Sequence, residues 1–447
     1  MRFSRTADRA SHYGTRSSGR QESPERRYIL AAITDMRRFF AALIAVLVAA
    51  ASIGCGSTTA PATTKKVIKV GMILTYSGAD ASIGEAIDRA AELYLTLHRS
   101  ELPPDIDLQI VKRDETGPSP DVARRLAQEL LVRDGVQLLT GGQWTPNVSA
   151  IAPLVTKAGI PYVVMSSGTS NTTRLSPYIV RVGFTVWQHS YHIGKWAAMN
   201  GITRVSTVVS DYAAGLDAEE AFKAGFADGG GTLVSSIRVP LRSPDYVPFL
   251  ERIRREKPQA LYGFNPGGPE ATRFIKAYHD LGLATSGIRL IGPAAIVPDD
   301  ELKNMGDAAL GVISSSHYSS SGDRSANRTF VTEWQKAYGV DSVPSYFAAG
   351  GWDGMAAIVS VIKSQNGDLE LKRTMETLSH WSNPDSPRGP MAIDPETRDV
   401  VQNIYIRRVE NVDGALRNIE FATIPSVKDP WKELHPVASE GAAAGQP

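Results

Sequence analysis

Residues 162–173 read YVVMSSGTSNTT, an apolar run that ends abruptly in a cluster of hydroxyl and amide side chains. The first four residues have the composition of a buried strand, and all of the next eight except Gly168 carry a hydroxyl or an amide. Such a cluster directly after a strand is either a solvated turn or a site that holds a small polar molecule. The strands and helices predicted on either side of the stretch help to decide between a turn and a binding site.

Apolar runs alternate with amphipathic helical patterns on both sides of this stretch. About four strand–helix units precede residue 180 and about four follow residue 200, which predicts two doubly wound α/β lobes with parallel sheets. We expect strands at 66–74, 107–114, 136–142, 161–165, 204–210, 232–240, 259–264 and 288–293, with short strands around 390–410. We expect helices at 84–100, 119–135, 145–159, 218–230, 246–256, 269–282, 328–339 and 345–364.

Residues at the helix ends support these assignments. Ser119 can cap the helix that starts at Pro120, and Gly135 can end it. Thr145 can cap a helix over 146–158, and this role is an alternative to ligand contact for its hydroxyl.

The composition is that of an ordinary soluble globular protein, with 447 residues, 42% hydrophobic content and a formal net charge of +1. A net charge this close to zero gives no electrostatic case for a nucleic-acid partner. Cys55 is the single cysteine, so neither a disulfide nor a cysteine metal site can form within one chain.

The N-terminal region has the pattern of an export signal. From Met36 the chain reads MRRFFAALIAVLVAAASIGC, with two arginines, an apolar run and small residues before Cys55. The uncharged segment 39–54 is shorter than the roughly 20 residues that a membrane span needs. We interpret 1–55 as leader and signal peptide, with translation starting at Met36, 56–65 as a linker, and 431–447 as a disordered tail.

The residues before Cys55 resemble a bacterial lipobox, in which the cysteine is lipidated after cleavage. Ser52 departs from that pattern, since a large aliphatic residue usually stands three positions before the cysteine. Lipidation would tether the protein to a membrane surface without a span. The alternative is ordinary cleavage, which leaves Cys55 free or removes it.

Small, polar and aromatic residues follow the predicted strands. In open parallel sheets, ligands bind outside the carboxyl ends of the strands, so these loops should meet around one cavity. Hydroxyls and free amides next to a helix N-terminus suit a carboxylate or another anionic group. The loops read TYSGADASIG (75–84), GGQWTPN (141–147), SSGTSNTT (166–173), SDYAAG (210–215), GFNPGGPE (263–270) and GPAAIV (292–297).

Catalytic and cofactor motifs are missing from the sequence. It contains no phosphate-binding P-loop, no G-x-S-x-G nucleophile elbow, and no G-x-G-x-x-G after the first strand. His189 and His192 have H-x-x-H spacing, but we expect them to cover a helix face rather than to bind a metal. We therefore predict a protein that is not an enzyme and that uses no cofactor or metal.

The order of these elements resembles a type I periplasmic binding protein of the Leu/Ile/Val- and amide-binding group, the substrate-binding lipoproteins of ABC importers. The resemblance covers about 66–430. The stretches that carry it include IKVGMILTYSGADASIGEA, APLVTKAGIPYVVMSSGT, DYAAGLDAEEAFKAGF and RGPMAIDPETRDVVQNIYIRRVE.

The resemblance implies two Rossmann-like lobes joined by three crossovers, which close on a ligand by hinge motion. One lobe would comprise 66–184 and 316–384, and the other 185–315 and 385–430. The protein would be exported to the periplasm or cell surface, lipid-anchored there, and would deliver a small molecule to a membrane permease. The alternatives are a ligand sensor of the same fold that signals to a receptor or kinase, and an enzyme built on two α/β lobes.

The resemblance also implies which residues contact the ligand. Together with the strand-end loops, it gives Trp144, Thr145, Ser166, Gly168, Thr169, Ser170, Tyr212, Phe264, Asn265 and Tyr346.

Two departures from the family pattern affect the expected ligand. Ala294 or Ala295 stands where amino-acid binders of this group present an acid to the ligand ammonium, and Ala214 stands where they have a tyrosine. Losing that carboxylate would leave a buried cation without a partner. An aromatic or aliphatic carboxylate, or an amide, therefore fits better than a branched-chain amino acid.

Overall fold

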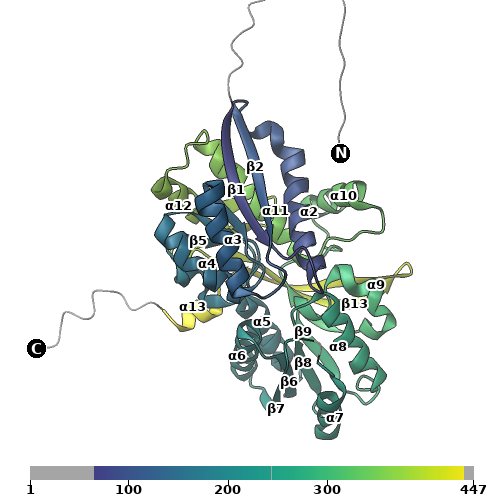
Figure 1. The fold of residues 1–447 in the computed structure, drawn as a ribbon. Helices are drawn as coiled ribbons and strands as arrows, with labels where there is room; N and C mark the ends of the chain where they lie inside the picture. The colour runs from purple at the N-terminus through teal and green to yellow at the C-terminus, as the bar shows by residue number, and fades with distance from the viewer. Residues whose placement is uncertain (1–64, 243, 437–447) are drawn as a thin grey trace, which may run out of the picture. The chain divides into compact units, whose positions relative to one another are not determined.

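The computed structural model describes residues 65–242 and 244–436 of the chain. The predicted signal segment with Cys55 lies outside these residues, as do all of the predicted linker except residue 65 and the part of the predicted tail from 437 onward. The described part contains two separate β-sheets, each covered by helices (Figure 1). The prediction of two α/β lobes is confirmed.

The first sheet has five parallel strands in the order β2-β1-β3-β4-β5. Its strands are β1 (Lys66–Leu74), β2 (Ile106–Asp114), β3 (Leu138–Gly141), β4 (Tyr162–Val164) and β5 (Ile179–Arg181). The helices that follow the first strands are α2 (Ala81–His98), α3 (Pro120–Glu129) and α4 (Thr145–Ala158).

Strands β1, β3 and β4 of this sheet are largely buried and mostly apolar, as expected where helices cover both faces, whereas the edge strand β2 is more polar and partly exposed. Along β1, Val70 and Met72 belong to the core shared with α2 and α11 (Tyr346–Ser364), whereas Ile73 packs in the core of α3 and α4. Figure 1 shows these two helix pairs on opposite sides of β1 and β2.

The second sheet has nine strands. Eight are in the order β11-β12-β13-β10-β9-β8-β6-β7, and β14 pairs with β13. The parallel part consists of β6 (Arg204–Ser210), β7 (Thr232–Val239), β8 (Ala260–Phe264), β9 (Arg289–Pro293) and β10 (Ile313–Ser316). Its helices are α5 (Val186–Met199), α6 (Ala213–Asp228), α7 (Val247–Glu256), α8 (Gly268–Asp280) and α9 (Leu302–Met305).

Three chain segments connect the two sheets. The chain leaves the first sheet after β5, returns after β10 to form helices α10–α12, and then enters the second sheet again. The elements in this last part are α10 (Ser325–Tyr338), α12 (Leu371–Ser379), β11 (Ser382–Asn383), β12 (Met391–Ile393), β13 (Val400–Val412), β14 (Ala415–Val427) and α13 (Pro430–Leu434).

The C-terminal region differs most from the sequence prediction. Where short strands are expected around 390–410, the short strand β12 is followed by β13, a 13-residue strand that forms a long antiparallel hairpin with β14. Residues 431–434 belong to helix α13 rather than to a disordered tail, and Lys432 there is buried. The ion pair between Lys432 and Asp399 explains this order, and no local pattern reveals it.

Several helix boundaries also differ from the prediction. Helix α3 ends at Glu129 and continues as a π-helical turn over Leu130–Asp134, although Gly135 does end it in a left-handed conformation. Ser119 occupies the cap position but makes no side-chain cap hydrogen bond. Helix α4 starts at Thr145 itself, with Trp144 at the cap position, so Thr145 is not the cap.

Helix α6 begins at Ala213, five residues earlier than its predicted start at 218. The small residues that suggested a loop allow the first turn to pack against the end of β6. A Cβ atom on Gly215 would lie 1.8 Å from the Ser210 carbonyl oxygen, so only glycine fits at this position.

Candidate functional site

A cavity lies between the carboxyl ends of the strands of both sheets. Its empty volume is about 520 Å³, part of which is open to solvent. This is the place where open parallel sheets bind ligands. The lining residues are Ile83, Gln143, Trp144, Thr145, Ser166, Gly168, Phe184, His189, Tyr212, Ala214, Phe264, Asn265, Pro266, Pro293, Ala295, Tyr346 and Phe347.

Most of the residues predicted from the sequence lie together in this lining. They are Trp144, Thr145, Ser166, Gly168, Tyr212, Phe264, Asn265 and Tyr346. Thr169 and Ser170 are not in the lining. Thr169 contacts Thr145 behind the wall, with 2.9 Å between the two hydroxyl oxygens, and the Ser170 amide donates to Asp217.

One part of the wall presents uncharged hydrogen-bond donors. Thr145 opens helix α4 and its backbone amide has no acceptor within the helix, whereas Pro146 has no N–H and the Asn147 amide donates to the Trp144 carbonyl oxygen at 3.1 Å. The Ser166 side chain lines the cavity nearby in the loop after β4. A helix N-terminus with a hydroxyl beside it favours a carboxylate oxygen over a cation.

Aromatic rings form much of the remaining wall. Tyr212 and Phe264 stack with their centroids 6.2 Å apart, and Tyr346 and Phe347 lie 4.0 Å apart. The Trp144 indole is held in place because its Nε1 donates to Thr75 Oγ1 at 3.0 Å. Flat faces of this kind are suited to an aromatic ring and leave a few polar groups to orient it.

The lining contains no Asp, Glu, Lys or Arg. Pro293 at the end of β9 and Ala295 just after it form this part of the wall, where the resemblance predicts an acidic residue in amino-acid binders. A ligand ammonium would therefore enter a buried site without a carboxylate partner in the lining, which is strongly unfavourable.

His189 is a lining residue that the sequence analysis assigned to ordinary helix packing. Its Nε2 lies 3.1 Å from Nδ1 of His317, which follows β10. Burial lowers the pKa of His189 to about 3, and the nearby charge of Arg407 adds to this effect, so the ring is neutral. The partner is 128 residues away in the sequence, and no local signal connects the two. His192 instead bonds the Gln188 carbonyl of its own helix.

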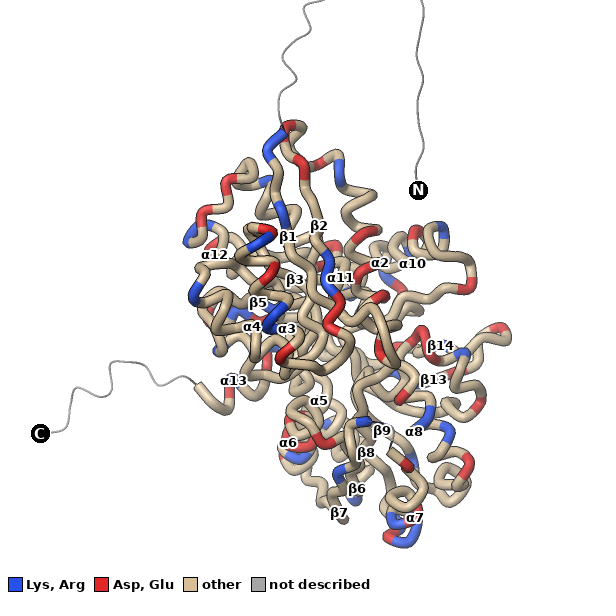
Figure 2. The backbone as a smooth tube through the Cα atoms, viewed as in Figure 1, with Lys and Arg blue, Asp and Glu red and all other residues tan. Residues whose placement is uncertain are grey.

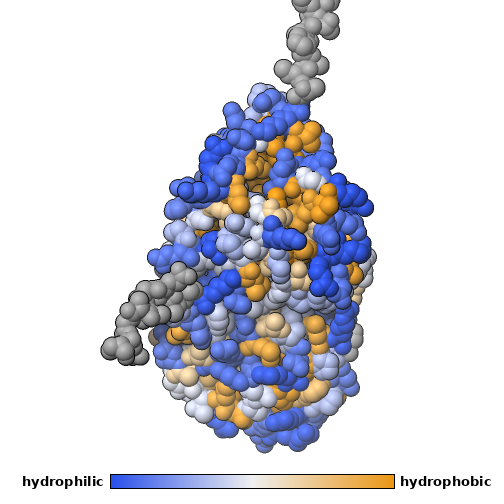
Figure 3. All heavy atoms as spheres, turned by 60° about the vertical axis from the view of Figure 1, so that its left-hand side comes forward, coloured by the Kyte–Doolittle hydropathy of each residue, from blue (hydrophilic) through white to orange (hydrophobic). Residues whose placement is uncertain are grey.

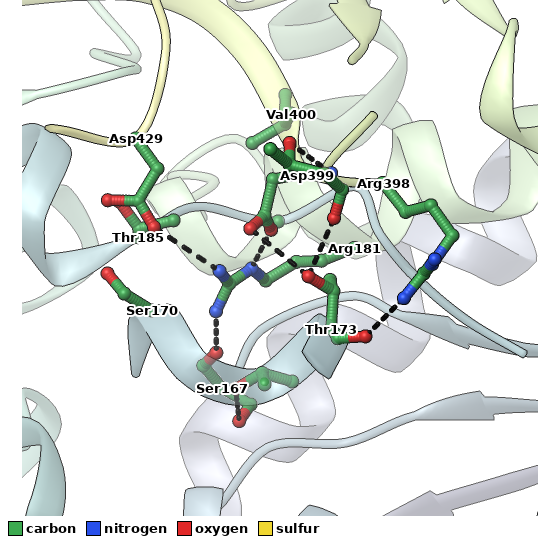
Figure 4. Close-up of polar contacts among 12 residues, drawn as sticks. Ser167, Ser170, Thr173, Arg181, Thr185, Arg398, Asp399, Val400 and Asp429 are labelled. Carbon is green, nitrogen blue, oxygen red and sulfur yellow. Dashed lines mark hydrogen bonds and ion pairs between the residues drawn. The ribbon is translucent and has the colours of Figure 1, made fainter. Parts of the chain in front are cut away.

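Buried Arg181 anchors the loop after β4, which carries Ser166 (Figure 4). Its Nη1 donates to the carbonyl oxygens of Ser167 at 2.8 Å and Thr169 at 2.6 Å. Its Nε donates to Asp399 at 2.6 Å, and Lys432 also pairs with that carboxylate. Burial alone would raise the pKa of Asp399, but these two cations outweigh it and hold the pKa below its usual value.

The hydroxyls of the opening stretch therefore divide into two groups. Ser166 lines the cavity, whereas Thr172 donates to the Thr169 carbonyl and Thr173 to the Thr397 carbonyl. Ser167 adopts a left-handed backbone, with φ of 52°, and points its hydroxyl at Thr145. Both readings of the stretch apply, since one part lines the cavity and the other part builds the turn.

The lobes also touch beside the cavity. The amide of Ser170 in the first lobe donates to Asp217 Oδ2 on helix α6 of the second lobe at 3.0 Å. Burial raises the pKa of Asp217 to about 6, and the nearby carboxylates of Asp429 and Glu220 contribute.

Other surfaces of the described residues give weaker candidates. A larger cavity near the tip of the β13–β14 hairpin is lined by charges of both signs, including Asp307, Lys303 and Arg417, and lies away from the strand ends. Acidic and basic residues are interspersed on the outer helices (Figure 2), and apolar residues on the face in Figure 3 form small separate patches. Within 65–242 and 244–436, no helix is long and apolar enough to span a membrane, and no His/Cys/Asp/Glu group suits a metal.

Comparison with known proteins shows the family. The model of the family described as periplasmic binding protein matches residues 67–415. A relative from Brucella melitensis, named Leu/Ile/Val-binding protein homolog 6, is 39% identical over 377 residues, which cover 84% of this chain and 96% of the relative.

Two solved structures are also similar. A solute-binding protein of an ABC transporter from Rhodopseudomonas palustris BisB5, in complex with 3,4-dihydroxybenzoic acid, is 45% identical with a TM-score of 0.78, covering 82% of this chain and 99% of that one. Another from strain HaA2, in complex with p-hydroxybenzoic acid, is 38% identical with a TM-score of 0.79, covering 81% and 98%. The chain belongs to the periplasmic binding protein family, as a type I solute-binding component of an ABC importer.

Proposed function

We propose that this chain captures a small aromatic carboxylate of the hydroxybenzoate class and delivers it to the permease of its importer. The observation that carries the proposal is the cavity lining, which combines aromatic walls with uncharged donors and has no Asp or Glu. The ligands of the two Rhodopseudomonas palustris proteins support it, since both are hydroxylated benzoic acids.

In this proposal the ligand carboxylate is bound at the start of helix α4, by the backbone amide of Thr145 and by the hydroxyls of Thr145 and Ser166. The ring lies among Trp144, Tyr212 and Phe264. Micromolar affinity needs about 8 kcal/mol, which hydrogen bonds to a charged carboxylate and buried ring contacts can supply.

Capture would occur by closure of two lobes about the three connecting segments, with the first lobe at 66–184 and 316–384 and the second at 185–315 and 385–430. The contact between Ser170 and Asp217 would belong to the closed form. We further propose that export leaves the mature chain tethered by a lipid on Cys55, with the linker between tether and lobes. The mechanism is capture and release, without a chemical step.

Calorimetric titration of the purified chain with 4-hydroxybenzoate, benzoate and leucine tests the ligand class. We expect saturable binding of the aromatic acids at micromolar concentrations and little heat with leucine. Ser166→Ala should weaken both aromatic acids, whereas Ser149→Ala is a matched control, because that hydroxyl bonds the Thr145 carbonyl and does not line the cavity. Tight leucine binding without a response to aromatic acids would overturn the proposal.

A further inference from the structure

Two histidines form a pair at the junction of the lobes. His189 lies on α5 directly after the first connecting segment, and His317 lies on the second one, directly after β10. Their nitrogens Nε2 and Nδ1 are 3.1 Å apart. The ring of Phe184, another lining residue, lies nearly parallel to both, with centroid distances of 5.2 Å to His189 and 5.5 Å to His317.

Both rings are neutral, because they are fully buried and lie near the buried cations Arg388 and Arg407. A neutral imidazole has one N–H donor and one bare nitrogen acceptor. The pair uses one nitrogen of each ring for its shared hydrogen bond. The second nitrogen of His317, Nε2, is buried and has no hydrogen-bond partner among the described residues.

The second nitrogen of His189, Nδ1, also makes no hydrogen bond to any described residue, although the side chain is only 1% exposed and lines the cavity. The same helix shows what such a nitrogen does elsewhere, since Nδ1 of His192 bonds the carbonyl of Gln188 four residues earlier at 2.8 Å. For His189 the corresponding carbonyl is that of Thr185, the cap residue of α5, and no such bond forms there.

We propose that His189, held in place by His317, recognises a ring hydroxyl of the bound acid and makes the cavity selective for hydroxybenzoates over benzoate. This inference rests on the proposed function. A phenolic hydroxyl fits the free nitrogen in either tautomer, because it both donates and accepts. Benzoate would leave that nitrogen buried and unpaired, which disfavours binding.

The test is the ratio of the benzoate and 4-hydroxybenzoate dissociation constants, measured by calorimetry. In the native chain we expect 4-hydroxybenzoate to bind about tenfold more tightly. His189→Phe keeps a ring against Phe184 but has no nitrogen, so the ratio should fall close to one while the benzoate constant changes by less than about threefold. His192→Phe is the matched control and should leave the ratio unchanged.

The outcomes separate this inference from the proposed function. An unchanged ratio in His189→Phe, or equal weakening of both acids, overturns the role of His189 and leaves the ligand class standing. Failure of the native chain to bind either acid overturns both. If His189→Phe does not fold, as judged by circular dichroism, His189→Leu replaces it. Leucine offers neither a donor nor an acceptor, so an unchanged ratio there also counts against the inference.

Discussion

Replacing Glu115 by glutamine should stabilise the folded chain at neutral pH and change its stability little near pH 4.5. Glu115 follows β2 and is fully buried, and neither of its carboxylate oxygens has a hydrogen-bond partner among the described residues. Burial raises its pKa to about 8, and the neighbouring Asn147 and Thr75 offset this only in part. The folded chain therefore carries Glu115 as a neutral acid at pH 7, and glutamine has nearly the same shape without a proton to take up.

The size of the effect follows from proton linkage. An unfolded glutamate titrates near 4.3, so between that pH and about 8 the folded state binds more protons than the unfolded state. The contribution of Glu115 to stability is complete below pH 4.3 and is lost as the pH rises toward 8. About three pH units at 1.36 kcal/mol each give a ceiling of about 4 kcal/mol at pH 7.5, and water reaching the site would reduce it to about 2–3 kcal/mol.

Urea unfolding of the native chain and of Glu115→Gln at about pH 5 and about pH 7.5 gives the difference between their unfolding free energies at each pH. All other groups titrate in both proteins, so their contributions cancel in that difference. Glu219→Gln is the matched control. Burial opposes ionisation of Glu219, but hydrogen bonds from Lys223 and Arg238 outweigh it and lower its pKa. Glu219 is therefore charged at both pH values, and its substitution should cost nearly the same at each. A Glu115→Gln effect that does not grow with pH would refute the reasoning.

Three further substitutions test the site. Arg181→Met should cost about 3–5 kcal/mol in urea unfolding, since it removes the buried cation bonded to Asp399 and the donor to the Ser167 carbonyl oxygen, and a cost below about 1 kcal/mol would contradict the anchoring role. Gly168→Ala should weaken 4-hydroxybenzoate at least about tenfold in calorimetry, because its Cβ would lie 2.5 Å from Val186 Cγ2; unchanged affinity would show that the wall yields. Ala295→Asp should lower the affinity for 4-hydroxybenzoate at least about tenfold, because it places an unpaired negative charge in the lining. Unaltered affinity would contradict the claim that the lining must be free of negative charge.

The parts of the fold that local patterns determine were predictable. Strand β1 matches its predicted range, and Gly135 and Gly159 end their helices in left-handed conformations as expected of glycine after a helix. The β13–β14 hairpin was not predicted beyond short strands, because its length comes from pairing across the sheet rather than from a pattern within the strand.

The location of the site was predictable from the sequence, but the orientation of its individual side chains was not. The rule that ligands bind at strand ends gathered Trp144, Ser166 and Tyr212 around one cavity. The rule does not say which side chains of a loop face inward. Thr169 and Ser170 turn to the wall behind, and His189 acquires its partner through a contact between segments far apart in the sequence.

The charged groups near the cavity hold the connecting segments together instead of meeting the ligand. Buried Arg388 donates to the carbonyl oxygen of Gly183 in the first connecting segment and pairs with Asp353 on α11. Buried Arg407 on β13 donates to the carbonyl oxygen of Tyr318 in the second and pairs with Asp299. Both arginines bond carboxylates and backbone carbonyls, and neither lines the cavity. The lining therefore consists of aromatic rings, apolar side chains and uncharged polar groups. Discrimination between ligands must then depend on where hydroxyls and aromatic faces lie, and this is why a single ring nitrogen can decide between two benzoates.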